Sequence, residues 1–139
     1  MKKINYTRSN IKTKVKSKKT DSEIEKKRKE IQKKSNEMRH EIFQNKLKSE
    51  NIKFIPEYKF NAVRNWRIDY YFEMNGVKVG LEIEGGVFAK GRHTRGKGFM
   101  KDIEKYNSFS LHGIYLIRTV PVELNSIELL NTIKSMLKI

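Results

Sequence analysis

Three acidic residues in the middle of the chain have the types and the spacing needed to hold a divalent cation. Glu82 and Glu84 lie in residues 77–84, where charged and apolar residues alternate at the end of the segment. The two-residue period of a β-strand then puts both carboxylates on one face. Asp69 lies in the preceding strand-like segment. Counting outward from the Asn75-Gly76 turn places Asp69 opposite Glu82, with their Cβ atoms roughly 4.5–5.5 Å apart.

Like charges that face one another across a strand pair repel, and a protein can relieve this repulsion in two ways. One is a bound cation, and hard oxygen ligands favour Mg²⁺ or Mn²⁺. The other is ion pairing with Arg and Lys side chains of the following loop and helix. The sequence therefore predicts a metal site at Asp69, Glu82 and Glu84 and leaves the ion-paired arrangement open. Glu41, on a helix before the sheet, is a further candidate for this site.

The segment after the acids, residues 85–98, contains five glycines and five basic side chains. Glycines let a backbone approach a phosphate closely and the cations neutralise it, although a basic surface loop without a ligand has the same pattern. Lys101 and Lys105 follow at helical spacing, so either could stabilise charge developing on a phosphate. Trp66, between two arginines, either stacks on a base or packs on the core. The side chains predicted to bind DNA phosphates are Arg64, Arg67, Arg92, His93, Arg95, Lys97 and Lys105.

The elements that must position these residues form a mixed α/β (α+β) fold. Residues 21–49 have helical composition, and their apolar spacing is convincing only from Met38 onward. An edge-type strand interrupted by Pro56 comes next, then the hairpin of residues 67–84. A helix that begins near Phe99 and ends at Gly113, a buried strand over 114–119 and a final helix complete the order: helix, strand, hairpin, helix, strand, helix. The final helix is predicted to be capped by Asn125 or Ser126.

Charge divides the 139-residue chain into three predicted parts. Residues 1–50 carry 17 Lys and Arg against 7 Asp and Glu, whereas residues 51–139 carry 14 against 9. We expect a basic disordered arm over 1–20, a charged helical extension over 21–36 and a folded domain over 37–139. A net charge of +15 indicates a polyanionic partner, most commonly a nucleic acid. No apolar run has the roughly 18 residues of a membrane span. The absence of cysteine excludes disulfides and fits a cytoplasmic protein.

Four segments of the chain resemble a known group of enzymes. The runs EYKFNAVRNWRIDYYF, LEIEGG, GRHTRGKGFMKDIEKYN and GIYLIRT are similar to the small phage and prophage nucleases of the PD-(D/E)xK superfamily, which are related to very-short-patch-repair endonucleases. The resemblance covers about residues 55–119 and implies a restriction-endonuclease-like core and Mg²⁺-dependent hydrolysis of phosphodiester bonds. Asp69 and Glu82 match the family's two acids, and the Ile83 carbonyl is implied as a further ligand. Glu84 departs from the pattern, because the family usually has a lysine there.

The sequence thus predicts a Mg²⁺-dependent DNA endonuclease, with Mn²⁺ as a substitute, encoded by a phage or prophage and acting in the bacterial cytoplasm. The predicted catalytic residues are Asp69, Glu82, Glu84 and Lys101, with Lys105 as the other candidate for the missing lysine. DNA is the expected partner, membranes are not, and cutting of branched junctions would favour a homodimer. Two other functions stay open: a nucleic-acid-binding protein on the same fold without catalysis, and an inhibitor or adaptor that binds an acidic protein.

Overall fold

The order of elements along the chain is the order that the sequence predicts. The computed structural model describes residues 20–85 and 95–139, and the elements of these parts form a mixed α+β fold with a mostly antiparallel sheet. They are α1 (Asp21–Ser49), β1 (Ile55–Lys59), β2 (Arg67–Met74), β3 (Val77–Ile83), α2 (Arg95–Leu111), β4 (Ile114–Thr119) and α3 (Ile127–Leu137). The predicted basic arm lies outside the described residues, apart from its last residue, Thr20.

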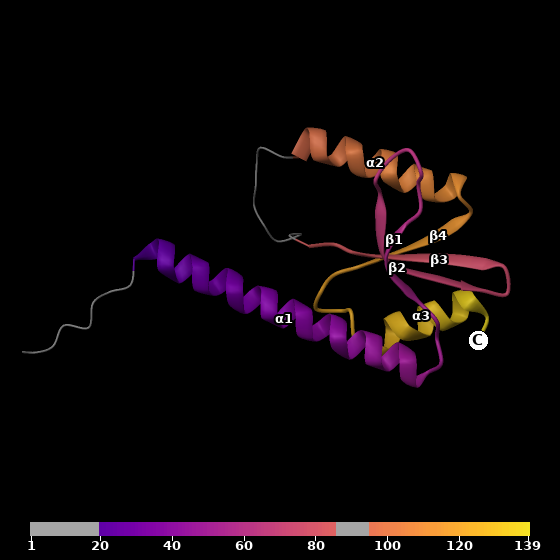
Figure 1. Cartoon of the computed structure of the whole chain (residues 1–139), viewed down its shortest axis with the longest axis horizontal. Coiled ribbons are helices and arrows are strands. Elements are labelled where there is room, and N and C mark those ends of the chain that lie inside the picture. Colours follow the sequence, from indigo (N-terminus) through magenta and orange to yellow (C-terminus); the bar gives the residue numbers. More distant parts are fainter. Residues whose placement is uncertain (1–19, 86–94) are drawn as a thin grey trace, which may run out of the picture.

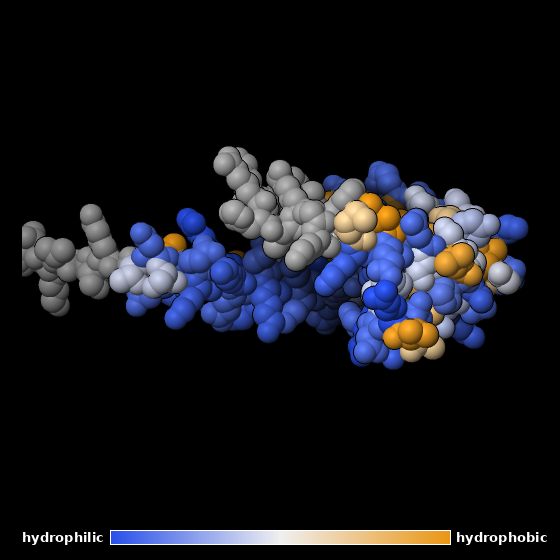
Figure 2. Space-filling model, turned by 90° about the horizontal axis from the view of Figure 1, so that it is seen from above, coloured by the Kyte–Doolittle hydropathy of each residue, from blue (hydrophilic) through white to orange (hydrophobic). Residues whose placement is uncertain are grey.

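Helix α1 is an extension at one end and part of the folded unit at the other. Thr20 precedes its first turn, and the Glu23 carboxylate accepts a hydrogen bond from the Thr20 N–H at 3.2 Å. Residues 21–34 are exposed, whereas Phe43 and Leu47 are buried. The helix therefore projects from the sheet over its first half, as Figure 1 shows, and this part of its surface is hydrophilic in Figure 2. The predicted boundary at residue 36 between the extension and the folded domain stays a prediction.

The hairpin of β2 and β3 forms the middle of the sheet, whose strand order is β1-β2-β3-β4. Asn75 and Gly76 make the turn with φ of 52° and 77°, the conformation that a two-residue hairpin turn requires. Met74 therefore pairs with Val77, which is the predicted register. Strand β1 is antiparallel to β2, and β4 is parallel to β3.

Strands β1 and β4 are the two edges of the sheet. Pro56 is tolerated in β1 because an edge strand has one side without ladder partners. The prediction of a buried strand over Ile114–Thr119 is correct in its bounds but wrong in its burial, since Tyr115 is 60 % exposed and Arg118 is also exposed. An edge strand with a helix on one face has no need for apolar side chains throughout.

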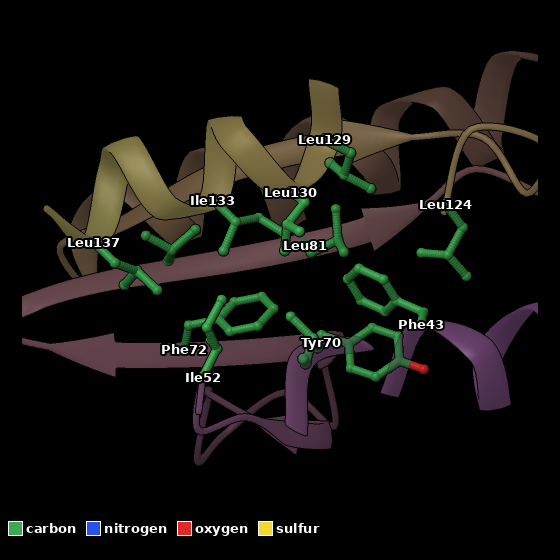
Figure 3. Packing of buried hydrophobic residues seen from close by; sticks show 12 residues of the cluster. Phe43, Ile52, Tyr70, Phe72, Leu81, Leu124, Leu129, Leu130, Ile133 and Leu137 are labelled. Carbon is green, nitrogen blue, oxygen red and sulfur yellow. The ribbon is translucent and has the colours of Figure 1, made fainter. Parts of the chain in front are cut away.

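Helices cover both faces of the sheet, and each face has its own apolar cluster (Figure 1). Between α1, α3 and the hairpin lies the larger cluster, in which each fully buried Leu or Phe contributes about 1.5–3 kcal/mol. Figure 3 shows its packing, and its labelled members are Phe43, Ile52, Tyr70, Phe72, Leu81, Leu124, Leu129, Leu130, Ile133 and Leu137. The smaller cluster, on the α2 face, contains Phe60, Ile68, Tyr71, Phe109 and Ile114.

The ends of α2 and α3 also follow the sequence. Gly113 has a φ of 64° and ends the α2 segment, and the Ser126 hydroxyl accepts a hydrogen bond from the Leu129 N–H at 3.1 Å. Helix α2 begins at Arg95, earlier than the apolar spacing alone predicts. Within the described residues, no helix combines the length and apolar character that crossing a membrane requires.

Gly80 lies where β3 meets the smaller cluster, and its replacement tests how closely that face is packed. A Cβ at this position would lie 3.2 Å from Ile114 Cγ2 and 3.3 Å from two Ile68 atoms. We expect Gly80→Val to lower the free energy of unfolding by roughly 1–3 kcal/mol, the usual cost of overpacking. Urea denaturation measures the change. Gly98→Ala, where a Cβ meets nothing within 4 Å, should be neutral or stabilising; equal losses in both variants would contradict the packing argument.

Candidate active site

An interruption between β1 and β2 places Asp69 at a bend. Tyr58 pairs with Ile68 and Pro56 pairs with Tyr70, but the residues between them, Glu57 and Asp69, are missing from the ladder. Glu57 has a φ of 50°, which is strained for a residue with a side chain. Beyond the interruption the faces change: Ile68 belongs to the α2-side cluster and Tyr70 to the other. Local distortions of this kind re-aim a side chain at a strand end.

Asp69 is held at the end of the hairpin by the backbone of β3. The Ile83 N–H donates to Asp69 Oδ2 at 2.6 Å, just beyond the last ladder pair, Tyr70 with Leu81. The carboxylate thus takes the place that a backbone carbonyl has in a continuing ladder. Asp69 also acts on Glu82, because its negative charge is among the causes that raise the Glu82 pKa. The ladder itself ends at Tyr70 with Leu81, so the direct pairing of Asp69 with Glu82 stays a prediction.

Glu82 faces α2 and forms an ion pair with Lys105. The Lys105 ammonium donates to both carboxylate oxygens of Glu82 at 2.9 Å, and the two side chains are only 20 % and 13 % exposed. Burial raises the pKa of Glu82, and the charges of Asp69 and Glu84 add to this, while Lys105 opposes them. The ion-paired arrangement that the sequence left open is thus present at Glu82, with a partner from the helix.

Glu84 has its own partners, which come from α2 and β4. Tyr106 donates its hydroxyl proton to Glu84 Oε1 at 2.6 Å, and Arg118 Nε donates to the same oxygen at 2.7 Å. The Arg118 guanidinium also stacks on the Tyr106 ring, 4.4 Å from its centre. Burial alone would raise the pKa of Glu84, but these hydrogen bonds outweigh it, so the pKa is lowered. Contacts from α2 to both Glu82 and Glu84 confirm that the two acids share a face.

A pocket of about 210 Å³ opens on the other side of Asp69. Asn36, Arg39 and His40 of α1 line one wall, and Glu57, Asp69 and Ile83 lie across from them. The opposite walls come from segments far apart in the sequence, so no spacing rule could have joined them. Helix α1 meets this pocket at the point where its exposed half gives way to its packed half.

The other predicted residues are distributed unevenly around the acids. Lys101 is exposed, one turn of α2 before Lys105. Arg64 pairs with Glu104 and lies over the Trp66 ring, which is half-buried beside Phe60 as the packing alternative predicts.

Arg67 is exposed at the start of β2, and Glu41 is exposed on α1 and is not among the described residues lining the pocket at Asp69. Arg92 and His93, and the side chains of Arg95 and Lys97, lie outside the described part of the chain.

Several residues of the site were not found from the sequence, namely Arg39, His40, Glu57, Tyr106 and Arg118. Each acts through a contact between elements distant in the chain. In the parts of the chain that the structure describes, no three His, Asp or Glu side chains form a ready-made metal cluster. Instead each acid has its own partner: Asp69 accepts from the Ile83 N–H, Glu82 pairs with Lys105, and Glu84 pairs with Arg118.

The partners of Glu84 make stability depend on pH in a direction that can be tested. A lowered carboxyl pKa stabilises the folded protein above the ordinary value of 4.5, and this stability is lost as the pH falls through the lowered pKa. In Arg118→Gln we expect a higher Glu84 pKa and a loss of about 0.5 kcal/mol at neutral pH, the scale of a largely exposed ion pair. The difference should vanish at a pH below the lowered Glu84 pKa, where this carboxyl is protonated in both proteins.

NMR titration of Glu84 and urea unfolding, both with EDTA, measure these changes. Arg64→Gln is the matched control, because Arg64 pairs with Glu104 and should leave the Glu84 pKa unchanged. A stability difference of the same size at both pH values would assign the loss to packing on Tyr106 instead.

We compared the chain with protein-family models, with curated proteins and with solved structures, and none of the three comparisons gives a match.

Proposed function

We propose that this protein is a metal-dependent DNA endonuclease with a restriction-endonuclease-like core. The observation that carries the proposal is the pair of carboxylates at the end of the hairpin. Asp69 is fixed by the Ile83 N–H, and Glu82 beside it is held by the Lys105 ammonium. Two acids and one lysine at a strand end, in a chain of net charge +15, are the groups that hydrolysis of a polyanion by a metal nuclease uses.

The donor set at this site fits a magnesium ion. Mg²⁺ retains several waters and binds through one or two carboxylates, so a pair of acids is sufficient without a third. Asp69 uses Oδ2 for Ile83, which leaves Oδ1 as a ligand atom. Glu82 already holds a cation, the Lys105 ammonium, on both oxygens. Asp69, Glu82 and the Ile83 carbonyl are therefore the groups that would hold the metal, which would activate water and polarise the phosphate.

The residues of the chain would divide the remaining work. The Ile83 amide orients the Asp69 carboxylate, and the interruption opposite Glu57 leaves the Asp69 backbone out of the β1–β2 ladder. Lys105, once released from Glu82, would donate to a phosphate oxygen and stabilise the charge that develops there. Glu84 binds Arg118 and Tyr106, so we assign it to bracing the end of β3. DNA would be held through its backbone by the basic surface, without reading of sequence.

One observation favours a second function, nucleic-acid binding without catalysis. Lys105 neutralises Glu82, and Arg118 neutralises Glu84, so two of the three acids have partners without any metal. A protein in which these pairs are permanent would bind DNA but not cut it. The two functions differ in whether Mg²⁺ produces cleavage.

Replacing Asp69 tests the nuclease directly. We expect Asp69→Asn to reduce Mg²⁺-dependent cleavage of linear, nicked and four-way-junction DNA to background, because the variant loses the charge that holds the metal. Fluorescence anisotropy should show DNA binding close to that of the wild type, and EDTA should abolish cleavage by both proteins. Asp102→Asn, an exposed acid on α2, is the control and should cut normally. If the wild type binds DNA but does not cut it with either Mg²⁺ or Mn²⁺, the nuclease is rejected in favour of nucleic-acid binding without catalysis.

Lys101 and Lys105 of α2 form a matched pair for the missing motif lysine. We expect Lys105→Gln to slow cleavage by about 100-fold, the effect of removing one charge-stabilising donor. Lys101→Gln, which is exposed, should change cleavage less than about threefold, in keeping with a surface charge. Single-turnover rates at saturating DNA measure both, and thermal unfolding shows whether each variant is folded. If Lys101→Gln slows cleavage more than Lys105→Gln does, Lys101 rather than Lys105 takes the role of the motif lysine.

A further inference from the structure

The wall of α1 across from Asp69 contains a histidine whose orientation is fixed. His40 Nδ1 lies 2.7 Å from the Tyr70 hydroxyl, and the two rings stack with centres 5.7 Å apart. Tyr70 itself is 1 % exposed and belongs to the larger apolar cluster, with its hydroxyl oxygen at the margin of the cluster in Figure 3. The imidazole is therefore held by a side chain that cannot move without disturbing the core.

The hydrogen bonds of Tyr70 also favour one tautomer of His40. The Gln44 amide donates to the Tyr70 oxygen at 3.2 Å, so the phenol accepts from Gln44 and has its own proton to donate. His40 Nδ1, 2.7 Å away, is placed to accept that proton. In this arrangement the hydrogen of the neutral imidazole is on Nε2. We take this tautomer, in which Nε2 can donate to a ligand, as the one that the network favours.

The pocket that His40 lines is suited to a phosphodiester group. His40 and Arg39 provide a donor and a cation on the α1 wall, and Asp69 lies across the pocket. Asp69 and Glu57 would repel a phosphodiester less strongly than a free dianionic phosphate, because a phosphodiester has a single negative charge. Asn36 and His40 also line a second hollow along α1, whose charged residues are Lys29, Lys33, Glu37 and Glu41.

We propose that His40 is a further substrate-binding residue, whose Nε2–H donates to a non-bridging oxygen of the phosphodiester seated between α1 and Asp69. Tyr70 is the positioning residue that holds the imidazole in this tautomer. This inference rests on the proposed function, because it places the reacting group of the DNA backbone at the same acids. It also gives the long helix α1 a part in binding the substrate as well as in packing.

Two substitutions of His40 distinguish the roles of its two ring nitrogens. Gln reaches as far as Nε2 and can donate into the pocket, whereas Asn reaches only as far as Nδ1 and can still bind Tyr70. We expect His40→Asn to lose at least about tenfold in cleavage rate, the worth of one hydrogen bond to a charged group, and His40→Gln to keep most of it. Tyr70→Phe should lower kcat with little change in KM, because it frees the imidazole without removing it.

Imidazole ¹⁵N NMR gives a readout that does not need cleavage. The wild type should show the Nε2–H tautomer, and adding a short thymidine oligonucleotide without metal should shift the His40 signal. In Tyr70→Phe the tautomer should become mixed. Lys48→Gln, an exposed change at the far end of α1, should leave the His40 signal and the cleavage rate as in the wild type.

The outcomes separate this inference from the proposed function. Normal cleavage by His40→Asn, with Asp69→Asn inactive, would overturn the role of His40 and leave the nuclease standing. Equal losses in His40→Asn and His40→Gln would overturn it too, because they would show only that the ring is needed for packing. A wild type that does not cut, but whose His40 signal shifts with the oligonucleotide, would reject the nuclease and keep the phosphodiester site.

Discussion

The register of the β2–β3 hairpin is the constraint on which the rest of the structure depends. Asn75 and Gly76 set it locally, and burial of Phe72 and Val79 maintains it, since a slip by one residue would turn every side chain to the opposite face. The same register carries Asp69 to the Ile83 amide, five residues back from the turn. Burial of apolar side chains thus fixes the register in which the acids lie, although none of the acids belongs to the core.

The electrostatics of β3 follow from what each face of the sheet presents. Glu82 is enclosed beneath α2, so burial has the larger effect and its pKa rises despite Lys105. Glu84, nearer the edge, is less enclosed and has two donors, so its pKa falls. Two acids only two residues apart in the chain therefore have opposite pKa shifts. Environments that shift the pKa values of neighbouring carboxyl groups in opposite directions are typical of catalytic sites. In the proposed nuclease Glu82 would be a metal ligand, and Glu84 would stabilise the end of β3.

Helix α1 connects the core with the proposed substrate. Its last turns bury Phe43 and Leu47, and its middle carries Arg39 and His40 to the pocket at Asp69. Tyr70 joins the two regions, because its ring is packed in the core while its hydroxyl holds His40. Rigid packing behind a polar contact is what allows a binding site to keep its geometry. The exposed first half of α1 extends the basic surface away from this point.

The sequence by itself determined the elements, the turn and the hairpin register, because these depend on local preferences and on periods of two and 3.6 residues. It also placed Glu82 and Glu84 on one face, toward α2. Only the tertiary structure decided their partners. Lys105 rather than Lys101 meets Glu82, Arg118 reaches Glu84 from an edge strand, and His40 faces Asp69 from a helix. Such pairings depend on how helices cross the sheet, and crossing geometry is set by the packing of side chains from distant segments, which no local pattern encodes.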